Sequence, residues 1–204
     1  MILYGYAQSS ATYRVRIALN LKRLAWQDVP VDLLRNDQTA SGYLALNPQG
    51  LVPTLRTDTE DLTQSLAICE YLDEIQPTPR LLPNDPLGRA RVRAFAQAIA
   101  CEIHPLQNLK VLRRLRTFGL DRDEVQRWAR TAVEEGLVAC EALVAQHGGR
   151  FCFGDGVTLA DVVLIPQLAN ARRFDIKVQW PRLVAIEARC LALEAFRAAA
   201  PPAS

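Results

Sequence analysis

The sequence has few histidines, no long apolar run and no block of like charge. Its 204 residues include two histidines and no CxxC pair, so neither a zinc site nor any other metal site is indicated. No apolar stretch approaches the roughly 20 residues that cross a bilayer, and the N-terminus lacks the basic flank of a signal peptide. A net charge of +2 without long like-charge runs argues against a nucleic-acid arm or a polybasic membrane anchor. We expect no metal, no nucleic-acid partner and no membrane partner.

The five cysteines are odd in number and widely spaced, which argues against a disulfide framework. Cys69, Cys140 and Cys190 each fall on an apolar helical stripe, where a buried thiol behaves as a small hydrophobe. This usage predicts a soluble, cytoplasmic protein in a reducing compartment.

The first eighty residues alternate short strand and helix patterns. Strands are predicted at Ile2–Tyr6, Gln27–Leu33, Val52–Thr57 and Asp61–Thr63. A helix is expected from about Tyr13 to Leu24, and another begins at Ser65. This order is that of a thioredoxin-like α/β domain, which we place at residues 1–80.

The first predicted helix has an apolar and a charged side. Its spacing places Arg14, Arg16, Lys22 and Arg23 toward solvent, opposite Val15, Ala18, Leu19 and Leu21.

Beyond the first domain, strand patterns stop. Gln76–Pro86 contains four prolines, which is typical of a stiff connector. Apolar residues then recur at helical spacing, and Leu159–Leu168 is apolar nearly all round, as at the centre of a bundle. We therefore predict an all-α domain over residues 87–204.

Four segments carry candidate site chemistry, although ordinary capping or turn formation also explains each one alone. Ser9–Arg14 lies between a strand and a helix, where unpaired N–H groups favour an anion, and Gln64–Ser65 opens another helix in the same way. Asn47–Leu55 contains a proline directly before a strand, where a cis Val52–Pro53 bond would direct the Val52 backbone toward an extended peptide. Thr158–Asp161 has the form of a capping box and is interpreted as a folding device.

The order and spacing of these segments resemble the zeta class of the cytosolic glutathione transferases. The segment SSATYRVRIAL is similar to the class signature Ser-Ser-Cys-x-Trp-Arg-Val-Arg. NPQGLVPTL, QSLAICEYL, HPLQNLKVL, GDGVTLADVVLIPQ and NARRF also resemble zeta-class segments in family order, so the resemblance extends from Leu3 to about Ala198.

The resemblance implies a homodimer that binds glutathione and a small dicarboxylic keto acid. It implies that Ser10, with Ser9 beside it, forms a hydrogen bond with the glutathione sulfur. It also implies that Arg173 binds a substrate carboxylate. Residues implied to border bound glutathione or its partner substrate are Ser9, Ser10, Ala11, Thr12, Tyr13, Arg14, Gln38, Val52, Pro53, Gln64, Ser65, His104, Asn108, Leu109 and Lys110.

The resemblance further implies cis–trans isomerisation of maleylacetoacetate to fumarylacetoacetate, a reaction of aromatic amino acid catabolism. The close alternative is maleylpyruvate, but enzymes for that substrate carry arginines where this chain has Gln8 and Leu109. A broad transferase, a dehalogenase of α-halo acids and a non-catalytic binding module are further alternatives. Ala11 and Tyr13 depart from the class cysteine and tryptophan, and loss of the cysteine can alter side activities without removing isomerisation.

Overall fold

The computed structural model describes residues 1–202, and its backbone contacts divide the chain into two units. Of the described residues, unit 1 contains Met1–Leu81 and 193–202, and unit 2 contains Leu82–Ala192. The predicted helical domain, 87–204, included the C-terminal residues that group with unit 1.

Unit 1 combines a small mixed sheet with helices. In chain order its elements are β1 (Ile2–Gly5), α1 (Ser10–Lys22), β2 (Gln27–Pro30), η1 (Asp37–Thr39), α2 (Ser41–Leu44), β3 (Thr54–Arg56), β4 (Asp61–Thr63), α3 (Ser65–Ile75) and α9 (Glu194–Arg197).

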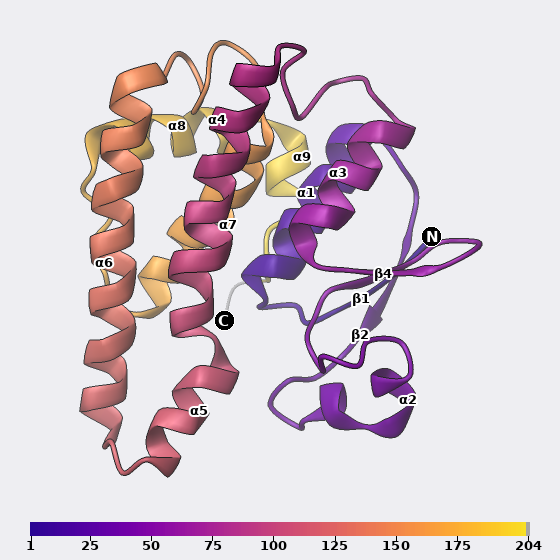
Figure 1. Cartoon of the computed structure of the whole chain (residues 1–204), viewed down its shortest axis with the longest axis vertical. Coiled ribbons are helices and arrows are strands. Elements are labelled where there is room, and N and C mark those ends of the chain that lie inside the picture. Colours follow the sequence, from indigo (N-terminus) through magenta and orange to yellow (C-terminus); the bar gives the residue numbers. More distant parts are fainter. Residues whose placement is uncertain (203–204) are drawn as a thin grey trace. The chain divides into compact units, whose positions relative to one another are not determined.

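The sheet of unit 1 has the strand order β2-β1-β3-β4, with β1 and β2 parallel and the other pairs antiparallel. Helices α1 and α3 lie side by side against it (Figure 1). Leu3 and its cross-strand neighbour Leu55 are fully buried, as are Ile68 and Leu72 of α3. These apolar contacts form the core, and the arrangement confirms the predicted thioredoxin-like fold.

The burial of α1 differs from the prediction. The helix begins at Ser10 rather than near Tyr13, and Arg14 and Lys22, which were expected to face solvent, are buried. Lys22 Nζ lies 2.6 Å from Asp73 Oδ1 in α3 and also donates to the carbonyl of Pro79. Burial of these two charges therefore depends on partners outside the helix.

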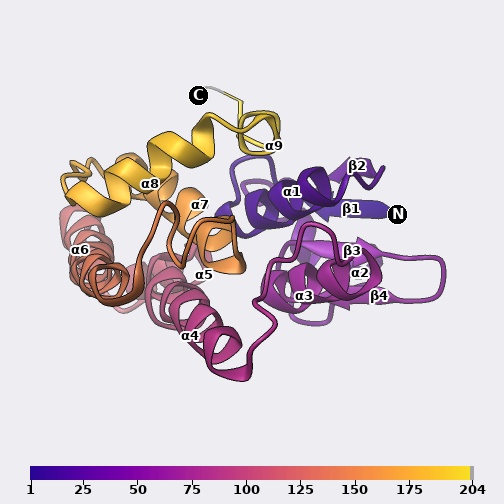
Figure 2. The same cartoon turned by 90° about the horizontal axis from the view of Figure 1, so that it is seen from above.

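Residues 193–202, here called the C-terminal tail, pack on α1. Helix α9 lies beside α1 in both views (Figures 1 and 2). The Tyr13 hydroxyl donates to the Phe196 carbonyl at 3.1 Å, and Asn20 Nδ2 donates to the Ala195 carbonyl at 3.0 Å. Gln8 Nε2 donates to the Pro202 carbonyl at 3.0 Å. These bonds explain why the tail belongs to unit 1.

Unit 2 is helical throughout its described elements, as predicted. They are α4 (Pro86–Gln97), the π-helix η2 (Ala98–Ile103), the 3₁₀ helix η3 (His104–Gln107), α5 (Leu109–Thr117), α6 (Arg122–His147), α7 (Leu159–Arg173) and α8 (Pro181–Leu191).

Helix α7 forms the centre of unit 2. It contacts α4, α6 and α8 (Figure 2), and every residue from Leu159 to Leu168 is buried. The predicted capping box is confirmed at its start, where the Asp161 carboxylate accepts from the Thr158 N–H at 2.8 Å. The box therefore satisfies backbone groups at the buried start of the helix.

Candidate functional site

The predicted anion site at the start of α1 contains two adjacent serines, which occupy different positions in the helix. Ser9 is the N-cap and its hydroxyl accepts from the Thr12 N–H at 3.2 Å. Ser10 is the first helical residue and is buried, not an exposed cap. The two adjacent serines thus have separate positions, one closing the helix start and one lying within its first turn.

The three residues after Ser10 support this helix start from inside unit 1. Ala11, Thr12 and Tyr13 are all buried. A Cβ added at Gly5 would lie 2.3 Å from Thr12 Cγ2, so the strand needs a glycine where α1 crosses it. Their side chains therefore anchor the first turn of α1 against β1 and the C-terminal tail.

The loop before β3 contains a cis Val52–Pro53 bond, as predicted. The Asn47 side chain donates to the Leu51 carbonyl at 2.7 Å and accepts from the Gln49 N–H at 3.0 Å. Tyr43 donates to the same carbonyl at 2.6 Å. Within residues 1–202, the backbone N–H and C=O of Val52 form no hydrogen bond. The loop therefore presents Val52 as a free main-chain donor and acceptor.

Sequence reasoning missed the supporting role of Tyr43. Burial raises the pKa of its phenol, which keeps the hydroxyl protonated as a donor to the loop. The Asn47–Pro48 pair predicts a turn from the sequence. No local sequence pattern indicates that Tyr43, in the preceding helix α2, donates to that turn.

Gln38 lies beside the same loop. A Cβ at Gly50, where φ is +61°, would approach the Gln38 carbonyl to 3.2 Å. Gln38 Oε1 is buried and has no hydrogen-bond partner among the described residues. An unpaired buried acceptor is uncommon and is suited to a ligand donor.

The start of α3 has a strained backbone and a buried cation. Gln64 has φ +67° and ψ 113°, a region that non-glycine residues seldom adopt outside functional sites. Its Nε2 donates to Gln49 Oε1 at 2.9 Å. Ser65 was expected to cap the helix, but Gln64 holds the N-cap position, and Ser65 Oγ accepts from Arg14 Nη1 at 3.2 Å. A buried guanidinium thus joins the starts of α1 and α3.

The remaining predicted residues lie in unit 2. His104 begins η3, and Asn108 is the N-cap of α5, with its Oδ1 accepting from the Lys110 N–H at 2.9 Å. Leu109 and Lys110 are exposed in the first turn of α5.

Two arginines end α7, and they have different surroundings. Arg172 makes a bidentate pair with Glu187, with both N–O distances 2.6 Å. Arg173 is the last residue of α7 and is exposed. The structure thus gives Arg172 an acidic partner in α8, which sequence reasoning did not identify.

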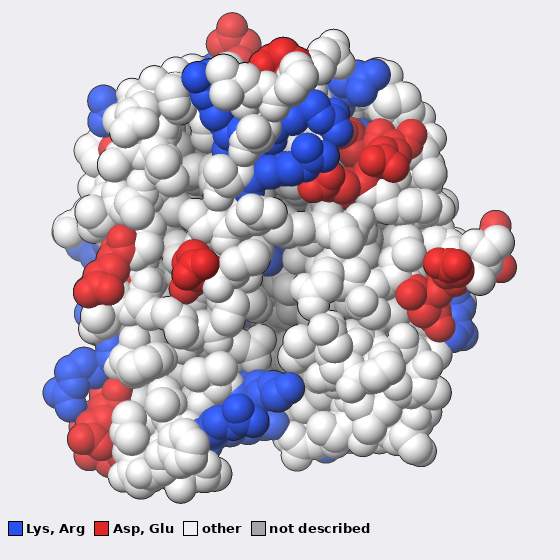
Figure 3. Space-filling model, in the orientation of Figure 1, with Lys and Arg blue, Asp and Glu red and all other residues white. Residues whose placement is uncertain are grey.

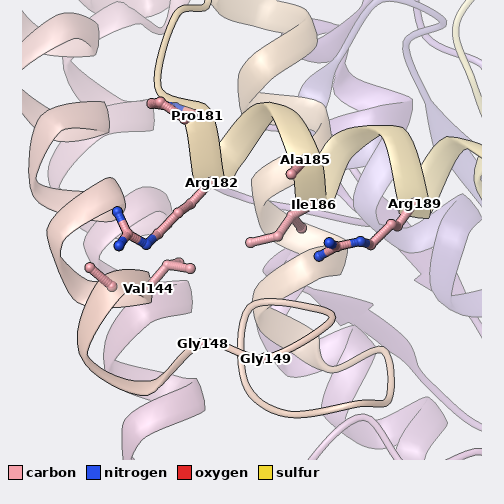
Figure 4. Close-up of a pocket in the computed structure, with 9 residues that line it drawn as sticks. Val144, Gly148, Gly149, Pro181, Arg182, Ala185, Ile186 and Arg189 are labelled. Carbon is pink, nitrogen blue, oxygen red and sulfur yellow. The ribbon is translucent and has the colours of Figure 1, made fainter.

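A cavity of about 480 Å³ in unit 2 contains none of the predicted site residues (Figure 4). Its two cations come from α8: Arg182 extends toward α6 beside Val144, and Arg189 extends over the loop that contains Gly149. Arg182 pairs with Glu141 at 3.4 Å, and Arg189 donates to the Arg150 carbonyl at 2.6 Å. Both arginines are already engaged, so the predicted segments remain the candidate site.

Four of the five cysteines are buried thiols. Cys69, Cys140, Cys152 and Cys190 are buried, and Cys101 is exposed. Burial raises the pKa values of Cys69 and Cys140 to about 12, so these thiols stay protonated.

The described residues contain no group of three or more potential metal ligands and no helix long and apolar enough to cross a membrane. On the face shown in Figure 3, basic and acidic groups lie next to one another in several places, and most of the remaining surface is uncharged. This distribution matches the absence of long like-charge runs in the sequence.

Comparison with known proteins finds the same family across nearly the whole chain. The family models for the N-terminal and C-terminal domains of glutathione S-transferase match residues 3–80 and 105–189. A maleylacetoacetate isomerase of Rhizobium meliloti is 49% identical over 98% of this chain and 95% of its own.

Two solved structures are also similar. A holo maleylpyruvate isomerase, described as a bacterial glutathione S-transferase of the zeta class, has a TM-score of 0.96 and 45% identity, covering 100% of this chain and 98% of its own. A maleylacetoacetate isomerase of Methylobacterium extorquens AM1, solved with malonate and GSH, has a TM-score of 0.95 and 41% identity, covering 98% and 96%. The chain belongs to the glutathione S-transferase family, and within it to the zeta class that includes the maleylacetoacetate and maleylpyruvate isomerases.

Proposed function

We propose that this protein is a glutathione-dependent isomerase that converts maleylacetoacetate to fumarylacetoacetate. The observation that carries the proposal is the hydrogen bond from Arg14 to Ser65, because it joins two predicted anion sites, the starts of α1 and α3, within one unit. The relatives named as maleylacetoacetate isomerases support the choice of reaction.

The groups presented by unit 1 fit a tripeptide thiol. The unpaired Val52 backbone suits the central residue of a peptide, and the unpaired Gln38 Oε1 suits an N–H donor. The start of α3, with the buried Arg14 charge behind Ser65, suits a carboxylate. We assign the γ-glutamyl end to Gln64 and Ser65, the cysteinyl backbone to Val52 and the glycyl end to Gln38.

Bound glutathione supplies a thiolate, whose reversible addition to the maleyl double bond permits rotation. A thiol of pKa near 8.5 requires about 2.7 kcal/mol of preference for its anion to ionise two pH units lower. A hydrogen bond to a charged group contributes about 1.5–3 kcal/mol, and a helix N-terminus about 0.3–1 kcal/mol. Together these contributions amount to about 1.8–4 kcal/mol, a range that includes the requirement. We therefore assign the anionic sulfur to Ser10, in the first turn of α1, without a general base.

We assign a substrate carboxylate to Arg173 in unit 2. Both Nη1 and Nη2 of Arg172 already donate to the Glu187 carboxylate, so this pair of nitrogens cannot also bind a substrate carboxylate. His104, Asn108, Leu109 and Lys110 are assigned to the border of the bound ligand, with Lys110 supplying a second cation.

The proposal also includes a cytoplasmic homodimer acting in aromatic amino acid catabolism. The cytoplasmic location is supported by the five cysteines, all unpaired in the part of the chain that the structure describes. The homodimer and the pathway follow from the family resemblance.

Maleylpyruvate is the second candidate substrate, because a maleylpyruvate isomerase covers the whole chain at a TM-score of 0.96. Gln8 and Leu109 favour maleylacetoacetate, since arginines are expected at both positions in enzymes for the smaller dianion.

The test measures kcat/KM for both acids with purified protein and glutathione, following the fumaryl product by absorbance. We expect maleylacetoacetate to be preferred, and Arg173→Ala to lower both values by about ten- to a hundredfold. Arg130→Ala, which removes an arginine of α6 whose side chain is 40% exposed, is the matched control and should match the unsubstituted protein. Preference for maleylpyruvate overturns the substrate assignment. Turnover of neither acid, together with retention on immobilised glutathione, would indicate a binding module instead.

A further inference from the structure

Residues 98–108, here called the 98–108 segment, connect α4 to α5 through two irregular helices. The π-helix η2 is followed directly by the 3₁₀ helix η3 and by Asn108. Neither helix type is stable over long runs, and π-helical turns are concentrated at functional sites. The segment contains His104 and is followed by Leu109 and Lys110, all assigned above to the ligand border. Its position must therefore be set by the elements packed on it.

Helix α6 packs closely against this segment at Gly136. A Cβ added at Gly136 would lie 2.3 Å from both Cγ1 and Cδ1 of Ile103, the last residue of η2. Ile103 is buried, and Gly136 lies well inside a 26-residue helix, where glycine is among the least favoured residues. The glycine therefore provides space for the Ile103 side chain.

A second contact from α6 is a hydrogen bond. Trp128 lies eight positions before Gly136, at a spacing that places both on one side of the helix. Its Nε1 donates to the Leu106 carbonyl in η3 at 2.9 Å. Helix α7 adds a third contact, because Gln167 Oε1 accepts from Gln107 Nε2 at 2.9 Å. The segment is thus held at its π-helical end and at its 3₁₀ turn.

We infer that Trp128, Gly136 and Gln167 are positioning residues that set the 98–108 segment, and through it His104 and Lys110, for the second substrate. The inference rests on the proposed function and assigns these three residues no contact with glutathione or the keto acid. It predicts that their substitution changes use of the keto acid and leaves glutathione binding unchanged.

Trp128→Phe gives the mildest test, because it removes the N–H donor and retains a large ring. Trp180→Phe is the matched control in the same unit, since the Trp180 indole N–H has no hydrogen-bond partner among residues 1–202. We expect Trp128→Phe to lower kcat/KM for the keto acid about two- to tenfold, with an unchanged KM for glutathione and a melting temperature lower by no more than a few degrees. Trp180→Phe should match the unsubstituted protein.

A size exchange tests the packing contact independently. Gly136→Ala should lower kcat/KM for the keto acid, whereas Gly42→Ala, with no atom within 4 Å of the added Cβ, should not. In the double variant Gly136→Ala/Ile103→Ala the two Cβ atoms would lie 3.5 Å apart, an ordinary contact. The double variant should therefore recover much of the loss. If kcat/KM does not recover in the double variant, the effect of Gly136→Ala does not come from its contact with Ile103.

Hydrogen–deuterium exchange of the 98–108 amides provides a readout that needs no substrate. We expect faster exchange there in Trp128→Phe and Gly136→Ala than in their controls. If the unsubstituted protein turns over neither acid, the proposed function fails, and the substrate role of the segment fails with it. If the protein is active but Trp128→Phe and Trp180→Phe have equal kcat/KM values, the positioning role alone is overturned.

Discussion

Removing one member of the Lys22–Asp73 ion pair should destabilise unit 1 strongly. The Lys22 side chain is completely buried and that of Asp73 is 6% exposed, so either substitution strands a charge away from water. Loss of one partner of a buried pair costs about 3–5 kcal/mol in the free energy of unfolding. Asp73→Leu should be the more damaging change, because Asp73 also accepts from the Leu81 N–H at 2.7 Å. An unsatisfied buried donor adds about 1–3 kcal/mol.

The double variant Lys22→Met/Asp73→Leu separates pairing from packing. Replacing a buried ion pair by apolar residues of similar volume is often neutral or stabilising by about 1–4 kcal/mol. The Leu81 N–H and the Pro79 carbonyl still lose their partners. We therefore expect the double variant to be no less stable than Asp73→Leu, with a coupling energy of at least about 3 kcal/mol.

Urea denaturation followed by circular dichroism measures the four proteins of this double-mutant cycle. Independent sites add to within about 0.5 kcal/mol. If the two single effects sum to the double effect within that limit, Lys22 and Asp73 do not stabilise one another, and the reasoning from their burial is refuted.

Three further measurements test the candidate site and its support. Ser10→Ala should lower isomerase kcat by about ten- to a hundredfold with little loss of stability, whereas Ser9→Ala should mainly lose the helix cap, about 0.5–2 kcal/mol; the reverse ranking would assign the sulfur contact to Ser9. Gly5→Ala should destabilise unit 1 by about 1–3 kcal/mol through its clash with Thr12 and weaken glutathione binding in calorimetry, and unchanged affinity would argue against that link. Ellman's reagent at pH 8 should titrate only Cys101 in the native protein and all five thiols after denaturation, because the other four are buried; rapid reaction of a second native thiol would contradict this.

Features that depend on neighbouring residues in one element were predictable from the sequence. The Thr158–Asp161 box, the strands and the buried centre of α7 all follow from local spacing. Each of these signals lies within about ten residues, which is the range over which periodicity and capping act. The cis Val52–Pro53 bond is different: its motif alone also fits an ordinary trans proline, and the cis form was expected from the family resemblance.

Features that depend on distant partners were not predictable in this way. Helical periodicity placed Arg14 and Lys22 with the other charged residues, but both pair with residues 51 positions away, in α3. Which serine is the N-cap and which lies in the first turn depends on the residue at which the helix begins. Sequence patterns leave such boundaries uncertain by one or two residues. Nothing in the apolar pattern around Ile103 distinguishes a π-helix from an α-helix.

The hydrogen bond between Tyr13 and Phe196 spans 183 positions, which has a consequence for synthesis on the ribosome. At about 5–20 residues per second, roughly 10–40 s pass between translation of the two residues. The strands and first helices of unit 1 emerge before unit 2, yet α1 lacks α9 as a neighbour until unit 2 has been translated. Unit 1 is thus the first to begin folding and the last to be completed, and a ribosome stalled after Ala192 would display it without its final helix.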